Sequence, residues 1–205
     1  MSIARSTTTL GALALAGLAS LTLLACGGGD GGGQQAQAGR EEAGGGQSAG
    51  GSEQGLPGWM EVNDSDRTVN MEVVAAKTSA NSNWNFNGYA NGNATITVPR
   101  GYEVTIEFRN EDPAVTHSLG IDEKPDRWSA TFSDPQPVFE GAITSNATSM
   151  SRATAPGSSE TITFTADQAG EYAMVCYIPG HATAGMWVWF HVSADGSAGF
   201  STSGS

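Results

Sequence analysis

The chain has 205 residues, and its 21 acidic residues outnumber its nine lysine and arginine residues, which gives a net charge of −12. This length allows one folded domain with appendages. A surface this acidic excludes nucleic acid and anionic lipid headgroups as binding partners. It would attract a basic partner or simply keep the protein in solution, and the charge alone does not separate these two roles.

The first 25 residues have the pattern of an export signal. Arg5 supplies a weak positive charge, and the run from Leu10 to Leu24 is apolar, uncharged and short for a membrane-spanning helix. The run leads into Leu23-Leu24-Ala25-Cys26, which resembles the lipobox of bacterial lipoproteins. That resemblance implies cleavage before Cys26 and a lipid anchor on it, at the outer face of the cytoplasmic membrane or in the periplasm or cell envelope. Secretion with a chance cysteine and an uncleaved anchor are the alternatives.

Residues 26–58 are predicted to form a flexible linker, because they hold half of the 28 glycines and almost no large apolar side chain. A glycine-rich coil of this length has a root-mean-square span of roughly 30 Å, which would let the domain search near a membrane surface. The folded domain is expected over residues 59–193. The last residues, 194–205, are expected to be disordered.

The domain is predicted to be all-β. Tyr102–Arg109 shows the clearest alternation, with Val104, Ile106 and Phe108 on one face and polar side chains on the other. No window has a convincing helical period. Residues 122–159 form a long irregular excursion with a short strand or helical turn. Many short strands with polar turns predict an antiparallel sandwich or barrel, with strands at 68–75, 94–98, 102–109, 161–165, 171–176 and 186–192.

The chemistry of the chain is concentrated in a loop with the spacing C-x4-H-x4-M, from Cys176 through His181 to Met186. A thiolate and a thioether are soft ligands that suit copper(I), and imidazole suits both copper oxidation states. A cysteine and two histidines with a long axial methionine describe a blue-copper electron-transfer site. His117, which follows the strand at 102–109, is the natural second imidazole because the chain has only three histidines.

This loop, together with His117-Ser118, resembles the cupredoxins and, within them, the sulfocyanin family, with rusticyanin a second relative. The likeness includes Asn85–Gly88, Val98–Gly101 and Gly180–Trp187. It implies a Greek-key β-sandwich, one copper ion and electron transfer at the outer face of a membrane. Ser118 would tie the two ligand loops together. The implied copper ligands are His117, Cys176, His181 and Met186.

Small apolar residues surround His181 and predict a flat port through which electrons pass when a partner docks; they are Ile178, Pro179, Ala182 and Ala184. Redox encounters of this kind bury little area and are transient. A c-type cytochrome or a terminal oxidase is the partner that the charge and the family likeness suggest, and the protein is expected to be a monomer. Trp187 and Trp189 could relay electrons, although packing is the commoner role of such aromatic residues.

Several details remain open from the sequence. Tyr177 is bulkier than a site needs next to its thiolate, and Pro179 has no N–H to donate to the sulfur, so another residue must donate. A copper enzyme would need further histidines, and His191, expected to be a half-exposed strand residue, is the one left over. The chain is therefore not expected to be an enzyme. A copper-binding or copper-delivery lipoprotein and a metal-free β-sandwich module are the rival interpretations.

Overall fold

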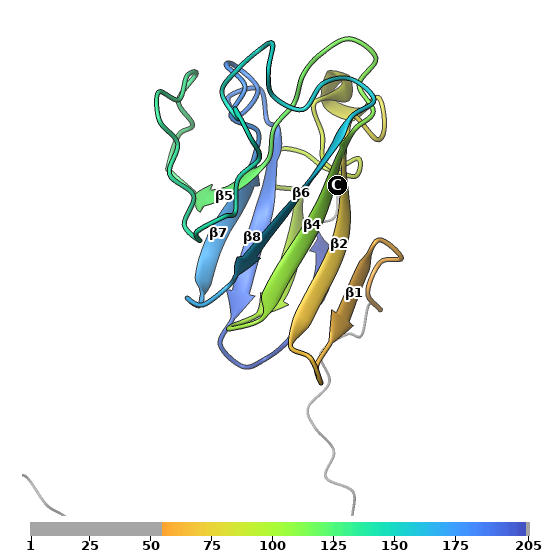
Figure 1. Cartoon of the computed structure of the whole chain (residues 1–205), viewed down its shortest axis with the longest axis vertical. Helices are drawn as coiled ribbons and strands as arrows, with labels where there is room; N and C mark the ends of the chain where they lie inside the picture. The colour runs from red at the N-terminus through yellow and green to blue at the C-terminus, as the bar shows by residue number, and fades with distance from the viewer. Residues whose placement is uncertain (1–54, 204–205) are drawn as a thin grey trace, which may run out of the picture. The chain divides into compact units, whose positions relative to one another are not determined.

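The computed structural model of the chain describes residues 55–203, which form a sandwich of two β-sheets (Figure 1). In sheet order, the first contains β1 (Met60–Asn63), β2 (Thr68–Ala75), β4 (Glu103–Asn110) and β6 (Ser159–Thr165). The second contains β5 (Gly120–Glu123), β7 (Gly170–Val175), β8 (Trp187–Ser193), β3 (Ala94–Pro99) and β9 (Gly199–Thr202). The predicted all-β sandwich is confirmed.

The core lies between the two sheets, where alternating residues of each strand meet. In β4, Val104, Ile106 and Phe108 are fully buried, as the alternation predicted. Phe164 of β6 reaches across the sandwich to Phe190 of β8, with ring centroids 6.1 Å apart. Each fully buried side chain of this size stabilises the fold by about 1.5–3 kcal/mol.

The sheets are mixed, so the expectation of a purely antiparallel arrangement was wrong. Strand β2 pairs in parallel with β4, and β3 pairs in parallel with β8. Parallel neighbours need a crossover connection. Between β2 and β4 the chain supplies it by passing through β3, which belongs to the other sheet. The alternation of apolar and polar residues along one strand carries no information about which strands become parallel neighbours.

The expected disorder of residues 194–205 was also wrong for most of the segment. Gly199–Thr202 forms β9, which pairs antiparallel with β3. Phe200 packs against Trp59 and Tyr89, at 5.1 Å between ring centroids in both cases. The free edge of β3 and this aromatic contact together explain why so polar a segment is ordered.

The loops that matter for function gather at one end of the sandwich, the upper end in Figure 1. Residues 122–159 begin with the end of β5 and continue as loop, with isolated bridges and two buried aromatic residues, Trp128 and Phe139. Within residues 55–203, no helix has the length and apolar character required to cross a bilayer. The predicted export signal, Cys26 and residues 26–54 of the linker lie outside the described residues.

Candidate metal centre

The ligand loop, Cys176–Met186, joins β7 to β8. Cys176 directly follows β7 and Met186 directly precedes β8, and these strands pair antiparallel. The Cys176 N–H donates to the Met186 carbonyl at 3.1 Å, and the Met186 N–H donates to the His181 carbonyl at 2.9 Å. A tight loop closed at its base in this way brings its three donor residues close together.

His117 comes from the connection between β4 and β5, where its N–H donates to the Thr154 carbonyl at 3.2 Å. The Cys176 Sγ lies 4.0 Å from His117 Nδ1 and 3.5 Å from His181 Nδ1. The donor atoms of these three residues all lie within 4.8 Å of one another, and all three residues are buried. Donors that share a metal through bonds of about 2.0–2.3 Å have separations of this size.

The fourth predicted ligand, Met186, is fully buried at the end of the ligand loop. Thiolate, thioether and two imidazoles form a donor set that fits copper in both oxidation states. Three of the predicted ligands therefore meet in one buried place, although His117 is distant from the others in sequence, and the fourth is buried at the end of the same loop.

Burial sets the protonation of the metal-free site. It raises the pKa of the Cys176 thiol, against hydrogen bonds that lower it. Burial, followed by the nearby His117, lowers the pKa of His181 to about 4. The pKa of His117 is lowered by burial, with Asp112 opposing. The ligand side chains are thus uncharged at pH 7, and copper binding must release the Cys176 proton.

The lowered histidine pKa predicts an acid-sensitive metal-free protein. His181 takes up a proton near pH 6.5 in the unfolded chain and only near pH 4 in the folded protein. Acid therefore favours the unfolded chain, and the free energy of unfolding is unaffected by this histidine's titration only above pH 6.5. We expect the free energy of unfolding to decrease by up to about 3 kcal/mol as the pH falls from 6.5 to 4. Urea unfolding of the metal-free protein at several pH values measures it, with His181→Gln as control. Parallel pH curves for the two proteins would contradict the prediction.

Asp112 contacts the ring nitrogen of His117 that is left free by the metal-facing one, and this residue was not identified from the sequence. Its Oδ2 lies 3.3 Å from His117 Nε2, and its Oδ1 accepts the N–H groups of Ala114 and Val115, both at 2.9 Å. Burial by itself would raise the pKa of the Asp112 carboxyl, but the two backbone donors and His117 together lower it. An ionised carboxylate keeps the proton on Nε2 and leaves the Nδ1 lone pair for the metal.

Ser118 connects the two ligand-bearing segments. Its N–H donates to Cys176 Sγ at 3.4 Å, and its hydroxyl accepts the Tyr177 N–H at 2.9 Å. Ser118 thereby supplies a sulfur hydrogen bond that Pro179 cannot make. Such contacts orient the thiolate and tune the metal.

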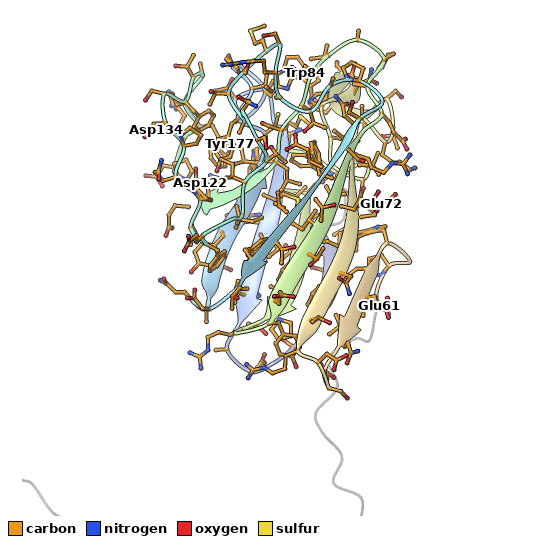
Figure 2. The ribbon with its side chains drawn as sticks, viewed as in Figure 1. Glu61, Glu72, Trp84, Asp122, Asp134 and Tyr177 are labelled. Atoms are coloured by element: carbon orange, nitrogen blue, oxygen red, sulfur yellow. The ribbon has the colours of Figure 1, made fainter. Side chains whose placement is uncertain are left out.

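Tyr177 fits beside the thiolate because the neighbouring strand has no side chain at the contact. Its buried ring packs edge-on against Phe132, at 5.0 Å between centroids, and its hydroxyl lies 3.2 Å from Asp122 Oδ2. Burial and the Asp122 carboxylate raise the pKa of Tyr177. A Cβ on Gly120 of β5 would lie 2.5 Å from the ring. Figure 2 labels Tyr177 and Asp122, which lie near β5.

The close approach at Gly120 predicts that Gly120→Ala destabilises the protein. The new methyl group would collide with the Tyr177 ring and lie 3.1 Å from the Ala142 carbonyl oxygen. We expect a loss of about 1–3 kcal/mol in the free energy of unfolding, measured by urea denaturation. Gly199→Ala is the matched control, because nothing lies within 4 Å of its added Cβ. Equal effects of the two changes would show that the packing argument fails.

The predicted port is partly wrong. Ile178 and Ala182 are only 1% and 2% exposed, so they line the interior, and only Pro179 and Ala184 reach the surface. His181 itself is 4% exposed. The residue that covers it is Trp84, whose ring stacks on the imidazole with centroids 4.2 Å apart and planes at 19°. The sequence offered no signal for this contact beyond the position of Trp84 just before Asn85–Gly88.

His191 is half-buried, as predicted, and Trp187 and Trp189 are half-buried on the same outward face of β8. Lys124 Nζ lies 4.9 Å from the Trp187 ring and 5.9 Å from the Trp189 ring. These are cation–π distances, which favour the packing interpretation of the two tryptophans.

A family model, the sulfocyanin (SoxE) domain, matches residues 58–203. The chain belongs to this family. Sulfocyanin of Sulfolobus acidocaldarius is 32% identical over 127 residues, which cover 60% of this chain and 62% of the relative. This chain thus spans less than two thirds of that relative's length.

Two groups of solved structures are similar as well. Rusticyanin from Thiobacillus ferrooxidans is 23% identical, with a TM-score of 0.43, and the match covers 66% of this chain and 86% of that one. Auracyanin from Roseiflexus castenholzii is 26% identical, with a TM-score of 0.42, covering 60% of this chain and 96% of that one.

Membership in the sulfocyanin family and the geometry of the donors agree on a type 1, or blue, copper site formed by His117, Cys176, His181 and Met186. Copper bound there supplies one-electron chemistry by alternating between two oxidation states.

Proposed function

We propose that this blue copper protein is an electron carrier that shuttles single electrons between membrane-associated respiratory redox partners. The observation that carries the proposal is the burial of the whole donor set, since the four ligands are between 0% and 4% exposed. An electron can reach a metal that is buried this way, whereas a substrate would need an open coordination position.

The surrounding residues act by holding the ligands still. Ser118 joins the two ligand segments, Asp112 fixes the His117 ring, and the loop base is closed between Cys176 and Met186. Ligands that are fixed by packing and hydrogen bonds move little when the electron arrives, which favours fast transfer. The same burial is unfavourable for copper delivery, which requires donors that a recipient can approach.

The partners and the location belong to this proposal. A net charge of −12 suits a basic partner, and a c-type cytochrome or a terminal oxidase is the kind we propose. The signal-like first 25 residues and the lipobox-like sequence at Cys26 support export and a lipid anchor at the outer face of the cytoplasmic membrane or in the cell envelope.

Adding copper(II) to the purified full-length protein tests the proposal. We expect one equivalent to bind, an intense blue absorption to appear, and the colour to disappear and return through reversible one-electron reduction. A colourless complex, or copper that passes readily to a weak chelator, would replace the electron carrier with the copper-delivery alternative.

A further inference from the structure

The outer side of the copper site is covered by an aromatic side chain from another part of the fold. Trp84 follows η1 (Ala80–Asn83), a turn between β2 and β3, and its ring stacks on His181. In Figure 2 it is labelled at the loop end of the sandwich. His181 is almost completely buried, whereas Trp84 is half-buried. An approaching molecule therefore meets the indole before the imidazole.

The turn that carries Trp84 is tied to the ligand loop. The Asn81 side chain donates from Nδ2 to the Trp84 carbonyl at 2.8 Å and to the Ala184 carbonyl at 2.9 Å. The Trp84 N–H donates back to the Asn81 carbonyl at 3.0 Å. The Asn81 side-chain amide thus links the backbone of Trp84 to the loop that holds His181. This link holds the two stacked rings in position.

The turn is also strained. Asn81, Ser82 and Asn83 are three consecutive non-glycine residues in the left-handed region, with φ of 49°, 56° and 71°. Such conformations cost free energy and persist where the surrounding structure imposes them, most often at functional sites. The buried Asn85 stabilises the turn, because its side-chain amide donates to the carbonyls of Thr78 and Ala80 at 2.8 Å each. The fold therefore maintains a costly turn whose result is the stacked indole.

We propose that Trp84 is the contact through which electrons enter and leave the copper site, with the Trp84–His181 stack taking the place of an exposed histidine port. This rests on the proposed electron-carrier function. The docking partner is a one-electron redox protein that presents its cofactor edge in a small apolar patch. In each encounter one centre loses an electron and the other gains it, and no bond forms or breaks. Overlap of the two parallel rings couples the partner to His181.

Electron self-exchange between copper(I) and copper(II) forms of the full-length protein tests the proposal without a known partner. Nuclear magnetic resonance line widths of mixtures give the rate, at an ionic strength that screens the net charge of −12. We expect Trp84→Leu to slow self-exchange by about tenfold or more, as for the loss of an anchoring aromatic residue in an encounter patch. Trp84→Phe, which keeps a stacked ring, should stay much closer to the unaltered protein. Trp189→Leu is the matched control, because this half-buried tryptophan packs against Trp187 and Lys124 and not on the His181 ring. The self-exchange rate of this variant should not change.

Self-exchange that is unchanged or faster in Trp84→Leu would overturn the proposal, since the indole would then either take no part in electron transfer or obstruct it. A Trp84→Phe variant as slow as the leucine variant would overturn it as well. The stack itself has an independent readout, because the indole ring current should shift the His181 ring protons upfield in the copper(I) protein, and unshifted protons would reject it. If the unaltered protein cannot be reduced reversibly, the electron-carrier function fails together with this proposal. If it exchanges normally and the variants match it, only the role of Trp84 fails.

Discussion

Cys176→Ser is expected to abolish the blue colour and reversible electron transfer. The thiolate gives the site its soft, anionic donor, and a serine hydroxyl in the same buried position stays protonated and binds copper weakly. We expect copper(II) affinity to fall by more than the roughly 10–100-fold that loss of an outer hydrogen-bonding residue costs. Absorption spectroscopy and copper titration measure both effects.

Cys26→Ser is the matched control for this change, because it removes the chain's other cysteine. It should leave colour and copper stoichiometry as they are. The metal-free Cys176→Ser protein should remain folded, since serine is smaller than cysteine and Ser118 lies beside the position as a hydrogen-bonding partner. An intensely blue Cys176→Ser protein would show that the thiolate ligand has been assigned wrongly.

Asp112→Asn is expected to raise the reduction potential of the copper. The carboxylate places a buried negative charge behind His117, which stabilises copper(II) more than copper(I). At an effective dielectric constant of about 20, two unit charges roughly 8 Å apart, with an imidazole ring between them, interact by about 2 kcal/mol, which is on the order of 100 mV for one electron. Asparagine keeps the shape and an oxygen for the Ala114 and Val115 N–H groups, but its amide cannot accept the His117 proton in place of Oδ2.

Spectroelectrochemistry measures the shift, and a copper(II) titration should show an affinity loss of about 10–100-fold. Glu111→Gln is the control, because Glu111 is a neighbouring carboxylate that is exposed and paired with Lys77 and Arg109. Exposed ion pairs contribute little, so its potential should barely move. A potential that stays constant or falls in Asp112→Asn would mean that the carboxylate neither carries charge nor orients the ring.

The sequence alone was sufficient for the features that depend on local pattern. Strand β4 could be predicted because side chains alternate between the two faces of a strand, so Val104, Ile106 and Phe108 had to share the buried face. The ligand loop could be predicted because Cys176 and Met186 lie at the ends of two neighbouring strands with His181 between them. With only three histidines in the chain, His117 was the natural choice for the second imidazole.

Tertiary structure alone decided what depends on contacts between distant segments. Strand β9 forms because β3 offers a free edge, and the parallel pairs arise because the chain crosses between sheets. Asp112 could have been suspected from its position five residues before His117, yet only the folded turn directs its Oδ2 to Nε2. The stacking of Trp84 on His181 joins residues nearly one hundred positions apart, and no periodicity or spacing encodes such a contact. The sequence by itself therefore determined the sandwich and the donor residues. The contact of the Asp112 carboxylate with His117 and the stacking of the Trp84 ring on His181 were decided by packing.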